Sequence, residues 1–425
     1  MQIIKYPNRD VWQQILSRPI MDSSSLFDTV RKVIDDIRLN GDDAVRQYTK
    51  KFDGVELSSF EVTQSEIDEA EKIVSAQLKQ AIEIAKNNIH KFHSAQMPEL
   101  KKIQTTSGVF CWQKAVGIEK VGLYIPGGTA PLFSTVLMLA IPAQIAGCKE
   151  ILLCSPPDKN GNIHPAVLYA AKISGVHKIL KIGGTQAIAA MAYGTESVPK
   201  VYKIFGPGNQ YVTAAKQLVS LKDVAIDMPA GPSEVEVLAD ETANPAFVAA
   251  DLLSQAEHGV DSQSILITTS ETLIEQVKVE IDKQLEQLPR KDLAKKALDN
   301  SKLILVETMA EAVEMTNEYA PEHLIISTES YTDIANSIVN AGSVFLGNYT
   351  PESAGDYASG TNHTLPTNGY AKAYSGVNLD SFMRKITFQE ITKEGLTNLS
   401  NAIILMAENE ELQAHSNAVK VRIGD

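Results

Sequence analysis

The sequence predicts an α/β fold with two parallel β-sheets. In two separate stretches, short apolar runs alternate with segments of helical character, and most of the runs end in glycine, proline or polar turn residues. This alternation is typical of βαβ units, whose parallel strands are covered by helices on both faces. At 425 residues, the chain is also too long for one ordinary hydrophobic core. Two α/β domains are therefore expected.

The N-terminal part predicts helices after a short arm over residues 1–22. Apolar residues recur at helical spacing from Leu26 to Ile37, and Gly41 follows as a stop signal. A longer helix is expected from about Ser65, with an apolar stripe that ends near Ile89. Because such helices need a sheet to cover, we expect residues 23–123 to join residues 233–378 in one larger, discontinuous domain.

The first series of strands predicts an inserted domain over residues 124–232. The apolar runs are VGLYI, EILLCSP, KILKIGG and VYKIFG. The segments between them, such as TVLMLAIPAQIAG and AVLYAAKISG, are apolar throughout and are expected to form buried helices.

The second series belongs to the larger domain, with the runs SEVEVLAD, SILITTS, KLILVE, HLIIST and SVFLGN. From about residue 380 the chain looks polar, helical and free of strands, so residues 379–425 are expected to form an arm. The predicted architecture is thus two Rossmann-like parallel-sheet domains with helical N-terminal and C-terminal arms.

Composition and charge exclude several classes of partner. The net charge is -13 and no Lys/Arg-rich run offsets it, which disfavours nucleic acids and anionic membranes. The N-terminus lacks the basic start and apolar stretch of a signal peptide, and no stretch approaches the ~20 apolar residues of a membrane span. Three cysteines without a C-x-x-C pair argue against a disulfide framework and a zinc–thiolate site. A cytoplasmic protein is expected.

Three glycine-containing turns predict a dinucleotide site in the inserted domain. They contain Gly127 and Gly128, Gly183 and Gly184, and the segment Gly206–Asn209. Glycine lets the backbone approach a ligand, and the N-terminus of the following helix attracts phosphate. None is a complete G-x-G-x-x-G, because Tyr211 stands at the last position of the third turn. A plain βα turn is the alternative at each place.

Histidines late in the chain predict a metal with an acid–base group beside it. His258, His323, His363 and His415 all lie in polar settings after residue 250, in the same half as Asp356. Imidazole is a common ligand of zinc and titrates near neutrality. The earlier histidines are interpreted as surface or packing residues, namely His90, His93, His164 and His177.

One pair within this group shares a helix face. Asn244 and Pro245 are expected to start the helix and Gly259 to end it, so that Gln255 and His258 stand three apart on one face. Two side chains placed in this way can converge on one ion. A polar helix end without a ligand is the alternative.

Other candidates are weaker from local sequence. Ser233 can orient a polar substrate, but no G-x-S-x-G elbow makes it a nucleophile. Glu322 and His323 are adjacent ionisable groups that can share proton transfer. Glu410 and His415 stand five apart near the C-terminus and need not face the same way. A turn serine, a surface pair and surface helix residues are the respective alternatives.

Taken together, seven segments resemble the histidinol dehydrogenase family in order and spacing. They are VGLYIPGGTAPLFSTVLMLA, IGGTQAIAAMAYGTESVPKVYKIFGPGN, AGPSEV, DLLSQAEHG, APEHL, GDYASGTNH and ELQAH. The resemblance extends from about residue 25 to the end of the chain. It implies a four-electron oxidation of L-histidinol to L-histidine through L-histidinal, the last step of histidine biosynthesis, with two NAD+ per turnover.

The resemblance also implies the residues of the site. One zinc ion per subunit would be held by Gln255, His258, Asp356 and His415. The substrate would contact these ligands and also Ser233, Glu322, His323, His363 and Glu410. NAD+ would contact Tyr124, Gln186 and Asn209. A homodimer is implied in which the C-terminal arm completes the site of the partner subunit.

We hypothesise that His323 takes the alcohol proton and that Glu322 activates water for the aldehyde step. Three rival functions fit parts of the sequence less well. A cysteine-dependent aldehyde dehydrogenase would use Cys148 or Cys154, but both lie in an apolar stretch where thiols are normally inert. A zinc hydrolase lacks the H-E-x-x-H spacing and would leave the glycine turns unused. A two-domain periplasmic binding protein is disfavoured by the missing signal peptide.

Overall fold

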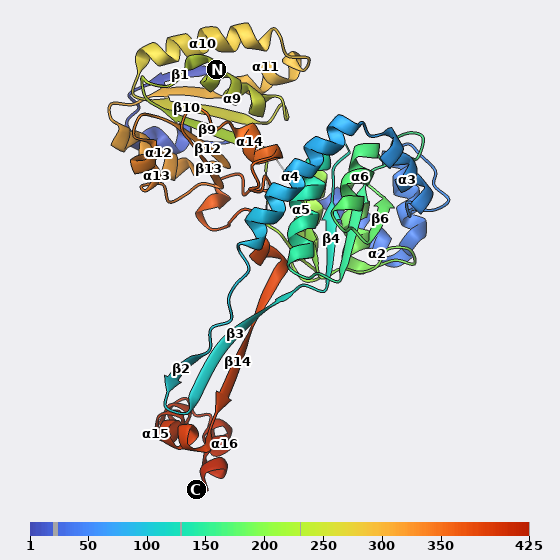
Figure 1. The fold of residues 1–425 in the computed structure, drawn as a ribbon, viewed down its shortest axis with the longest axis vertical. Helices are drawn as coiled ribbons and strands as arrows, with labels where there is room; N and C mark the ends of the chain where they lie inside the picture. The colour runs from blue at the N-terminus through green and yellow to red at the C-terminus, as the bar shows by residue number, and fades with distance from the viewer. Residues whose placement is uncertain (20–23, 128–129, 230, 425) are drawn as a thin grey trace.

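The computed structural model describes residues 1–19, 24–127, 130–229 and 231–424. Two sheet-and-helix bodies lie next to each other, and a long arm extends away from them to the C-terminus (Figure 1). The two parallel sheets predicted from the apolar runs are confirmed, and each of the nine runs forms a strand. Gly128 lies outside the described residues.

One body contains a five-stranded parallel sheet in the order β6-β5-β4-β7-β8. Its strands in chain order are β4 (Lys120–Tyr124), β5 (Glu150–Ser155), β6 (Lys178–Lys181), β7 (Lys203–Phe205) and β8 (Ala225–Ile226). The order reverses between β4 and β7, and ligands of open α/β sheets bind at such a switch point, beyond the carboxyl ends of the strands.

Helices cover both faces of this sheet. One buried cluster packs four helices on it, α3 (Gln64–Ile73), α4 (Ala76–Ser94), α5 (Phe133–Ile145) and α6 (Pro165–Ile173). A second cluster packs α2 (Ser24–Phe52), α7 (Gly184–Tyr193) and α8 (Gln210–Ser220) on the other face.

The first helices therefore do not cover the sheet we expected. Residues 23–123 were expected to pack with residues 233–378, but α2, α3 and α4 contact α5 to α8 of the five-stranded body. They stand directly before its strands in the chain, and consecutive elements usually pack together because short connections cost little. Gly41 interrupts α2 with φ 51° and ψ −132°, as its stop signal indicated, although a further helical segment continues to Phe52.

The expected long helix from Ser65 is two helices. Thr63 caps α3 in a capping box with Glu66, and α3 ends at Ile73 because Val74 is extended. Ser75 then caps α4. The apolar stripe continues across the break, with Ala70 and Ile89 both buried.

The other body contains a six-stranded parallel sheet in the order β1-β11-β10-β9-β12-β13. Its strands are β1 (Gln2–Lys5), β9 (Glu234–Ala239), β10 (Gln263–Thr268), β11 (Lys302–Leu305), β12 (His323–Ser327) and β13 (Ser343–Leu346). The helices α9 (Pro245–Ala256), α10 (Glu271–Leu285) and α11 (Lys291–Asp299) pack on one face. The short α1 (Trp12–Ile15), α12 (Met309–Tyr319) and α13 (Tyr331–Ala335) pack on the other face.

Both predicted arms differ from expectation in detail. The N-terminal segment is not a helical arm, because β1 pairs in parallel with β11 at the edge of the six-stranded sheet. The C-terminal arm contains a strand, β14 (Met383–Ile391), which pairs antiparallel with β3 (Val109–Gly117). β2 (Ile103–Thr106) completes this small sheet. The residues of β14 are mostly exposed and show no clear apolar pattern, which is why this strand was not predicted.

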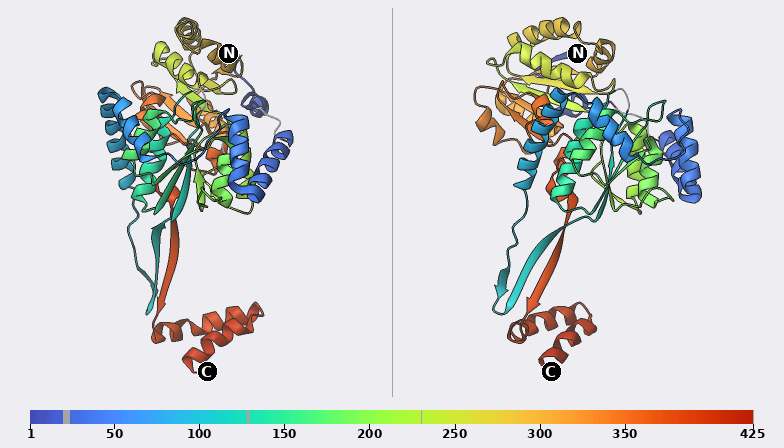
Figure 2. Two further views of the ribbon diagram at one scale, coloured as in Figure 1. Left: turned by 90° about the vertical axis from the view of Figure 1, so that its right-hand side faces the viewer. Right: turned by 45° about the vertical axis from the view of Figure 1, so that its right-hand side comes forward.

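Two helices, α15 (Lys393–Asn409) and α16 (Gln413–Ile423), lie at the far end of the arm, away from both large sheets (Figure 2). The two helices and the turn between them expose several large apolar side chains, including Leu405, Met406, Leu412 and Val421. Nowhere in the described ranges is there a helix with the length and apolar character needed to cross a membrane.

Candidate active site

The predicted acid–base residues lie at the amino ends of two neighbouring strands of the six-stranded sheet. β9 begins at Glu234 and β12 begins at His323, and the two strands are neighbours in register. The amino ends of these strands face a cavity of about 960 Å³ between the two bodies. Ser233, His258 and Glu322 line the cavity from the six-stranded body, and Asn209 and Gly208 line it from the switch-point side of the other body.

His323 is surrounded by carboxylates. It is buried, its Nδ1 lies 3.2 Å from the carbonyl oxygen of Glu234, and its Nε2 lies 3.4 Å from Asp356 Oδ1. The carboxylates of Glu322 and Glu352 lie 3.6 and 3.8 Å from Nδ1. Burial opposes a charged imidazole, but the negative charges of Glu352, Glu322 and Asp356 outweigh it and raise the pKa of His323 well above its usual value.

Glu322 is a buried carboxyl held by the backbone. Its Oε2 accepts a hydrogen bond of 2.8 Å from the amide of Glu234. Burial raises the pKa of Glu322 to about 8, although the neighbouring His323 and this hydrogen bond favour the ionised form. A carboxylate with so high a pKa is a stronger base than an exposed one.

Three side chains form a cluster suited to a divalent cation. One ligand atom from each of His258, Glu352 and Asp356 lies within 4.8 Å of the other two. Glu352 and Asp356 stand one turn apart on α14 (Glu352–Tyr357), and His258 follows the C-terminus of α9. Among the described residues, Glu352 Oε2, Asp356 Oδ1 and His323 Nε2 are buried without a hydrogen-bond partner. An imidazole with carboxylates whose oxygens lack donors fits a borderline cation such as Zn²⁺.

The ionisation of the cluster follows from its surroundings. Burial raises the pKa of Glu352 to about 8. The pKa of Asp356 is lowered despite burial, because His323 contacts it. His258 is exposed on the cavity wall, yet partial desolvation by that wall lowers the pKa of its ring. A neutral His258 is the form that can bind a metal.

Gln255 adjoins this cluster from the last turn of α9. Its side chain is buried between Glu352 Oε1 and the amide of Glu234, each 2.7 Å from one end of its amide group. With the nitrogen toward Glu352, both ends are hydrogen-bonded. With the oxygen toward Glu352, two acceptors face each other and the nitrogen faces the donating amide of Glu234, so hydrogen bonding within the protein favours the first orientation. The second orientation is the one in which Gln255 would bind a metal.

His363 joins the two bodies. Its Nε2 lies 3.0 Å from Thr135 Oγ1 on α5, and its Nδ1 lies 2.9 Å from the carbonyl oxygen of Asp356. Burial lowers the pKa of His363, so its ring is neutral near pH 7. The adjacent Asn362 donates to the carbonyl of Met138, also on α5. The segment from Asp356 to His363 thus begins on α14 and then packs against the five-stranded body.

The candidate cofactor residues lie at the carboxyl edge of the five-stranded sheet. Asn209 caps α8 through hydrogen bonds from the amides of Tyr211 and Val212. The Tyr124 hydroxyl accepts from the amide of Gly184, and Gln186 donates to Asp53. Gln186 and Tyr124 are buried, whereas Asn209 is exposed in the cavity.

Gly206 brings the Asn209 turn close to β4. Its φ is +123°, and a Cβ there would lie 2.1 Å from the carbonyl oxygen of Tyr124, so this turn requires glycine. The buried Lys216 and Asp227, 2.5 Å apart, bind the carbonyl and the amide of Gly206.

Glu410 and His415 do not join the site of their own chain. Both are exposed, and they lie where α15 meets α16 at the tip of the arm (Figures 1 and 2). By contrast, Gln255, His258, Asp356, Glu322, His323 and His363 come together, with Ser233 half-buried on the same cavity.

The sequence analysis missed two acidic residues of the site, Glu352 and Glu234. The four-residue spacing between Glu352 and Asp356 places them on one face of a helix, but no helix was predicted there. Glu234 was placed in a strand next to Ser233 and was given no role in the site.

The two cysteines of the rival dehydrogenase are poor nucleophiles. Cys148 and Cys154 are both buried. Burial raises the pKa of Cys148 to about 12 and that of Cys154 further, so neither is a thiolate at neutral pH.

Comparison with known proteins gives consistent results. A profile of the family "Histidinol dehydrogenase" matches residues 16–423. The histidinol dehydrogenase of Bacteroides fragilis is 69% identical over 423 residues, which cover 100% of this chain and 99% of the relative. The chloroplastic histidinol dehydrogenase of Arabidopsis thaliana is 53% identical over 412 residues, covering 96% and 88% of the two chains. The crystal structure of histidinol dehydrogenase from Elizabethkingia anophelis superposes with a TM-score of 0.98 at 55% identity and covers 100% of this chain and 98% of that one.

Proposed function

The chain belongs to the histidinol dehydrogenase family, and from this membership we propose that it oxidises L-histidinol to L-histidine through L-histidinal with NAD+ as the oxidant. The observation that best supports this chemistry is the adjacency of a cation-binding cluster and a carboxylate–histidine pair on one cavity, opposite a turn suited to a dinucleotide. A cation cluster, a carboxylate–histidine pair and a dinucleotide turn are each common alone, but alcohol oxidation at a metal-bound substrate needs all three.

The reaction requires two hydride transfers with a hydration between them. Written for the reacting carbon, RCH2OH + 2 NAD+ + H2O gives RCOO⁻ + 2 NADH + 3 H⁺. The first hydride leaves the alcohol carbon as its hydroxyl loses a proton. Water then adds to the aldehyde, and the hydrate gives up the second hydride and further protons. The protein must therefore supply a base for the alcohol and a base for water.

We assign the first base to His323. Donation from Nδ1 to the carbonyl of Glu234 fixes the tautomer, which leaves the lone pair of the neutral ring on Nε2. Nε2 points toward Asp356, where the cation cluster lies. Because the raised pKa of His323 arises from nearby carboxylates, any positive charge added to them brings its pKa down toward the range of a working base.

We assign the activation of water to Glu322. Its carboxyl is 3.6 Å from the His323 ring and lies on the wall of the cavity. Its raised pKa favours the uptake of a proton from water, and His323 remains available for the second hydride step.

Zinc, one ion per subunit, is the cation proposed for the cluster. Gln255, His258 and Asp356 would hold it, and Glu352 is placed to bind it or to orient Gln255. When bound, zinc supplies a positive charge that anchors the imidazole and amino groups of the substrate. Ser233 and His363 would orient the substrate, and Tyr124, Gln186 and Asn209 would contact NAD+.

We further propose a homodimer in which Glu410 and His415 of one chain complete the site of the other. Their position at the end of an extended arm, on helices that expose apolar side chains, supports this arrangement. Burial of these apolar side chains against a partner subunit would be favourable, whereas a single chain leaves them exposed to water.

The test is NADH formation from L-histidinol. Two NADH per histidinol, abolished by a chelator and restored by zinc, are expected. One NADH per histidinol would mean that oxidation stops at the aldehyde, and no NADH with any metal would reject the proposed function.

A further inference from the structure

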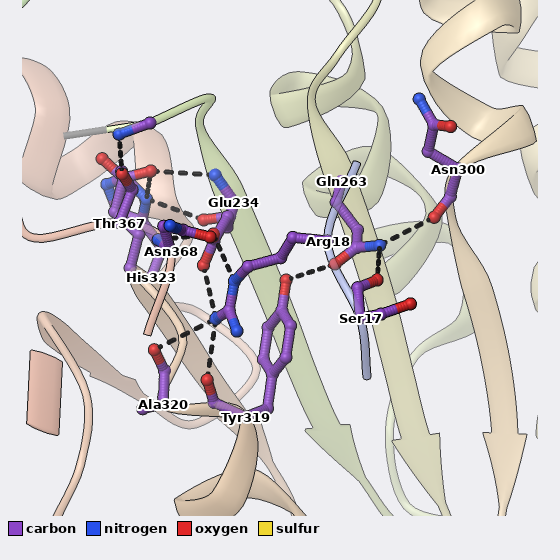
Figure 3. A network of polar contacts seen from close by, with 12 residues as sticks. Ser17, Arg18, Glu234, Gln263, Asn300, Tyr319, Ala320, His323, Thr367 and Asn368 are labelled. Carbon is purple, nitrogen blue, oxygen red and sulfur yellow. Dashed lines mark hydrogen bonds and ion pairs between the residues drawn. The ribbon is translucent and has the colours of Figure 1, made fainter. Parts of the chain in front are cut away.

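We infer that Arg18, through Glu234, positions the two acid–base residues of the site. This inference rests on the proposed function, because it concerns how that reaction is supported. Neither residue belongs to the set implied by the family resemblance. Figure 3 shows the network that carries the argument, referred to below as the Arg18 network, made of Ser17, Arg18, Glu234, Gln263, Tyr319 and Asn368.

The backbone of Glu234 touches both bases. Its amide donates to Glu322 Oε2 at 2.8 Å, and its carbonyl oxygen lies 3.2 Å from His323 Nδ1. The same amide lies 2.7 Å from the Gln255 side chain. A shift of this one residue would therefore move the hydrogen-bond partners of both bases and of a proposed metal ligand together.

The side chain of Glu234 is fixed by a buried ion pair. Arg18 Nε and Nη2 donate to its two carboxylate oxygens at 2.6 and 2.9 Å. The Arg18 side chain is only 16% exposed and that of Glu234 only 3%. A two-point pair at this depth sets both the distance and the plane of the partners, which a single ammonium group cannot do.

Arg18 also fixes the segment that leads to the bases. Its Nη2 donates to the carbonyl of Tyr319 at 2.7 Å, and its guanidinium lies 4.0 Å from the centre of the Tyr319 ring. Tyr319 ends α12, and Ala320 follows with φ 54° before the chain enters Glu322 and His323. The Arg18 guanidinium thus connects the first residue of β9 to the segment that precedes β12. These are the two strands whose first residues form the site.

Four further hydrogen bonds hold the network together. The Tyr319 hydroxyl donates to Gln263 Oε1 at 2.8 Å, and the Gln263 amide donates to the carbonyls of Ser17 and Asn300 at 3.2 and 2.9 Å. The backbone amide of Asn368 donates to Glu234 Oε1 at 2.7 Å. This hydrogen bond connects the segment that carries His363 to the Arg18 network. Arg18 is therefore a positioning residue, since its contacts are with residues that hold the bases and not with the bases themselves.

The test compares Arg18→Met with a matched control in the same segment. Arg9 pairs with Glu314 at 2.7 Å, but both side chains are mostly exposed. Arg9→Met should leave activity unchanged. Arg18→Met should lower kcat for NADH formation from L-histidinol by at least about 10-fold, because small displacements of reacting groups are costly. Its KM for NAD+ should stay within about twofold of the wild-type value, since the proposed NAD+ contacts lie on the other body.

Arg18→Lys separates positioning from charge. It keeps the positive charge but loses the second contact to Glu234, so it should recover only part of the lost kcat. In the double variant with Glu234→Gln, the two losses should not multiply, because both changes break the same pair. If Arg18→Met does not fold, as judged by circular dichroism, Arg18→Lys and Glu234→Gln provide the same comparison.

Three results would overturn the inference. The first is a folded Arg18→Met with wild-type kcat. The second is a loss of kcat accompanied by an equal rise in KM for NAD+, which would indicate general disruption. The third is Arg18→Lys with full activity. A wild-type protein that makes no NADH from L-histidinol would instead reject the proposed function, so the two failures are distinguishable.

Discussion

His323 Nε2 lies 3.4 Å from Asp356 Oδ1, so one histidine belongs both to a carboxylate–histidine pair and to the wall of a cation cluster. His323 stands on the first residue of a strand, and Asp356 stands on a short helix 33 residues later in the numbering. This contact places the proposed base where a metal-bound substrate would lie.

Replacement of Glu322 by Gln should separate the two oxidation steps. The amide keeps the hydrogen bond from Glu234 but cannot accept a proton, so oxidation of L-histidinal should fall by about 10²–10⁴-fold. Oxidation of L-histidinol to the aldehyde should fall less. Rapid-quench measurements with each substrate check this, and equal losses in both steps would contradict the division of roles between Glu322 and His323.

Replacement of Glu352 by Gln should weaken zinc binding. Glu352 lies within the cation cluster and beside Gln255, and removal of such a group typically lowers metal affinity by about 10–100-fold. Competition with a chromogenic chelator measures the affinity directly. The exposed Glu241 serves as the matched control, and Glu241→Gln should bind zinc as the wild type does. Wild-type affinity in Glu352→Gln would remove Glu352 from the site.

Mixing of two variants that are impaired in forming L-histidine should restore L-histidine formation if the arms are exchanged. Glu322→Gln disables the cavity and His415→Asn disables the arm. In a heterodimer, one site combines both defects and the other combines two intact parts, so the purified heterodimer should form L-histidine at roughly half of the wild-type rate. Co-expression with two affinity tags, followed by purification and assay, measures it. No recovery in a verified heterodimer would show that each arm serves its own chain, or none.

Replacement of Glu236 by Gln should stabilise the protein at alkaline pH. Glu236 is fully buried in β9, and burial raises its pKa to about 8. Between pH about 4.5 and 8 the unfolded carboxyl is ionised while the folded one keeps its proton, so the folded state binds more protons and stability falls as pH rises. Glu236→Gln removes this loss and should gain on the order of 2–4 kcal/mol at pH 8.

Urea unfolding at pH 5 and pH 8 tests this prediction. The difference between variant and wild type should be small at pH 5 and large at pH 8. The hydroxyl of Thr316 donates to Glu236 and can donate equally to a glutamine oxygen, so this contact should survive. A variant that is less stable at pH 8 would show that Glu236 is ionised and paired in the folded protein.

Much of the fold was predictable because its core strands are continuous apolar runs. Strands such as β4 and β5 are buried along nearly their whole length, and runs of this kind between turn residues leave few alternatives. Strands β1 and β14 were missed for the opposite reason, since each is exposed or half-buried along its length. The packing of α2 to α4 was assigned to the wrong sheet, because an amphipathic helix shows that it has an apolar face but not which sheet it covers.

The site divides in the same way. The residue pattern predicted the two sets of buried parallel strands and the proximity of Gln255 to His258, although α9 ends at Ala256 and His258 lies just beyond it. It also showed that Glu322 and His323 are adjacent. The contacts of these groups with Arg18, Glu234 and Glu352 could not be predicted, because the three residues come from separate segments that meet only in the folded protein. The physical reason is that residue spacing fixes contacts within a helix or strand, whereas contacts between distant segments depend on how whole elements pack.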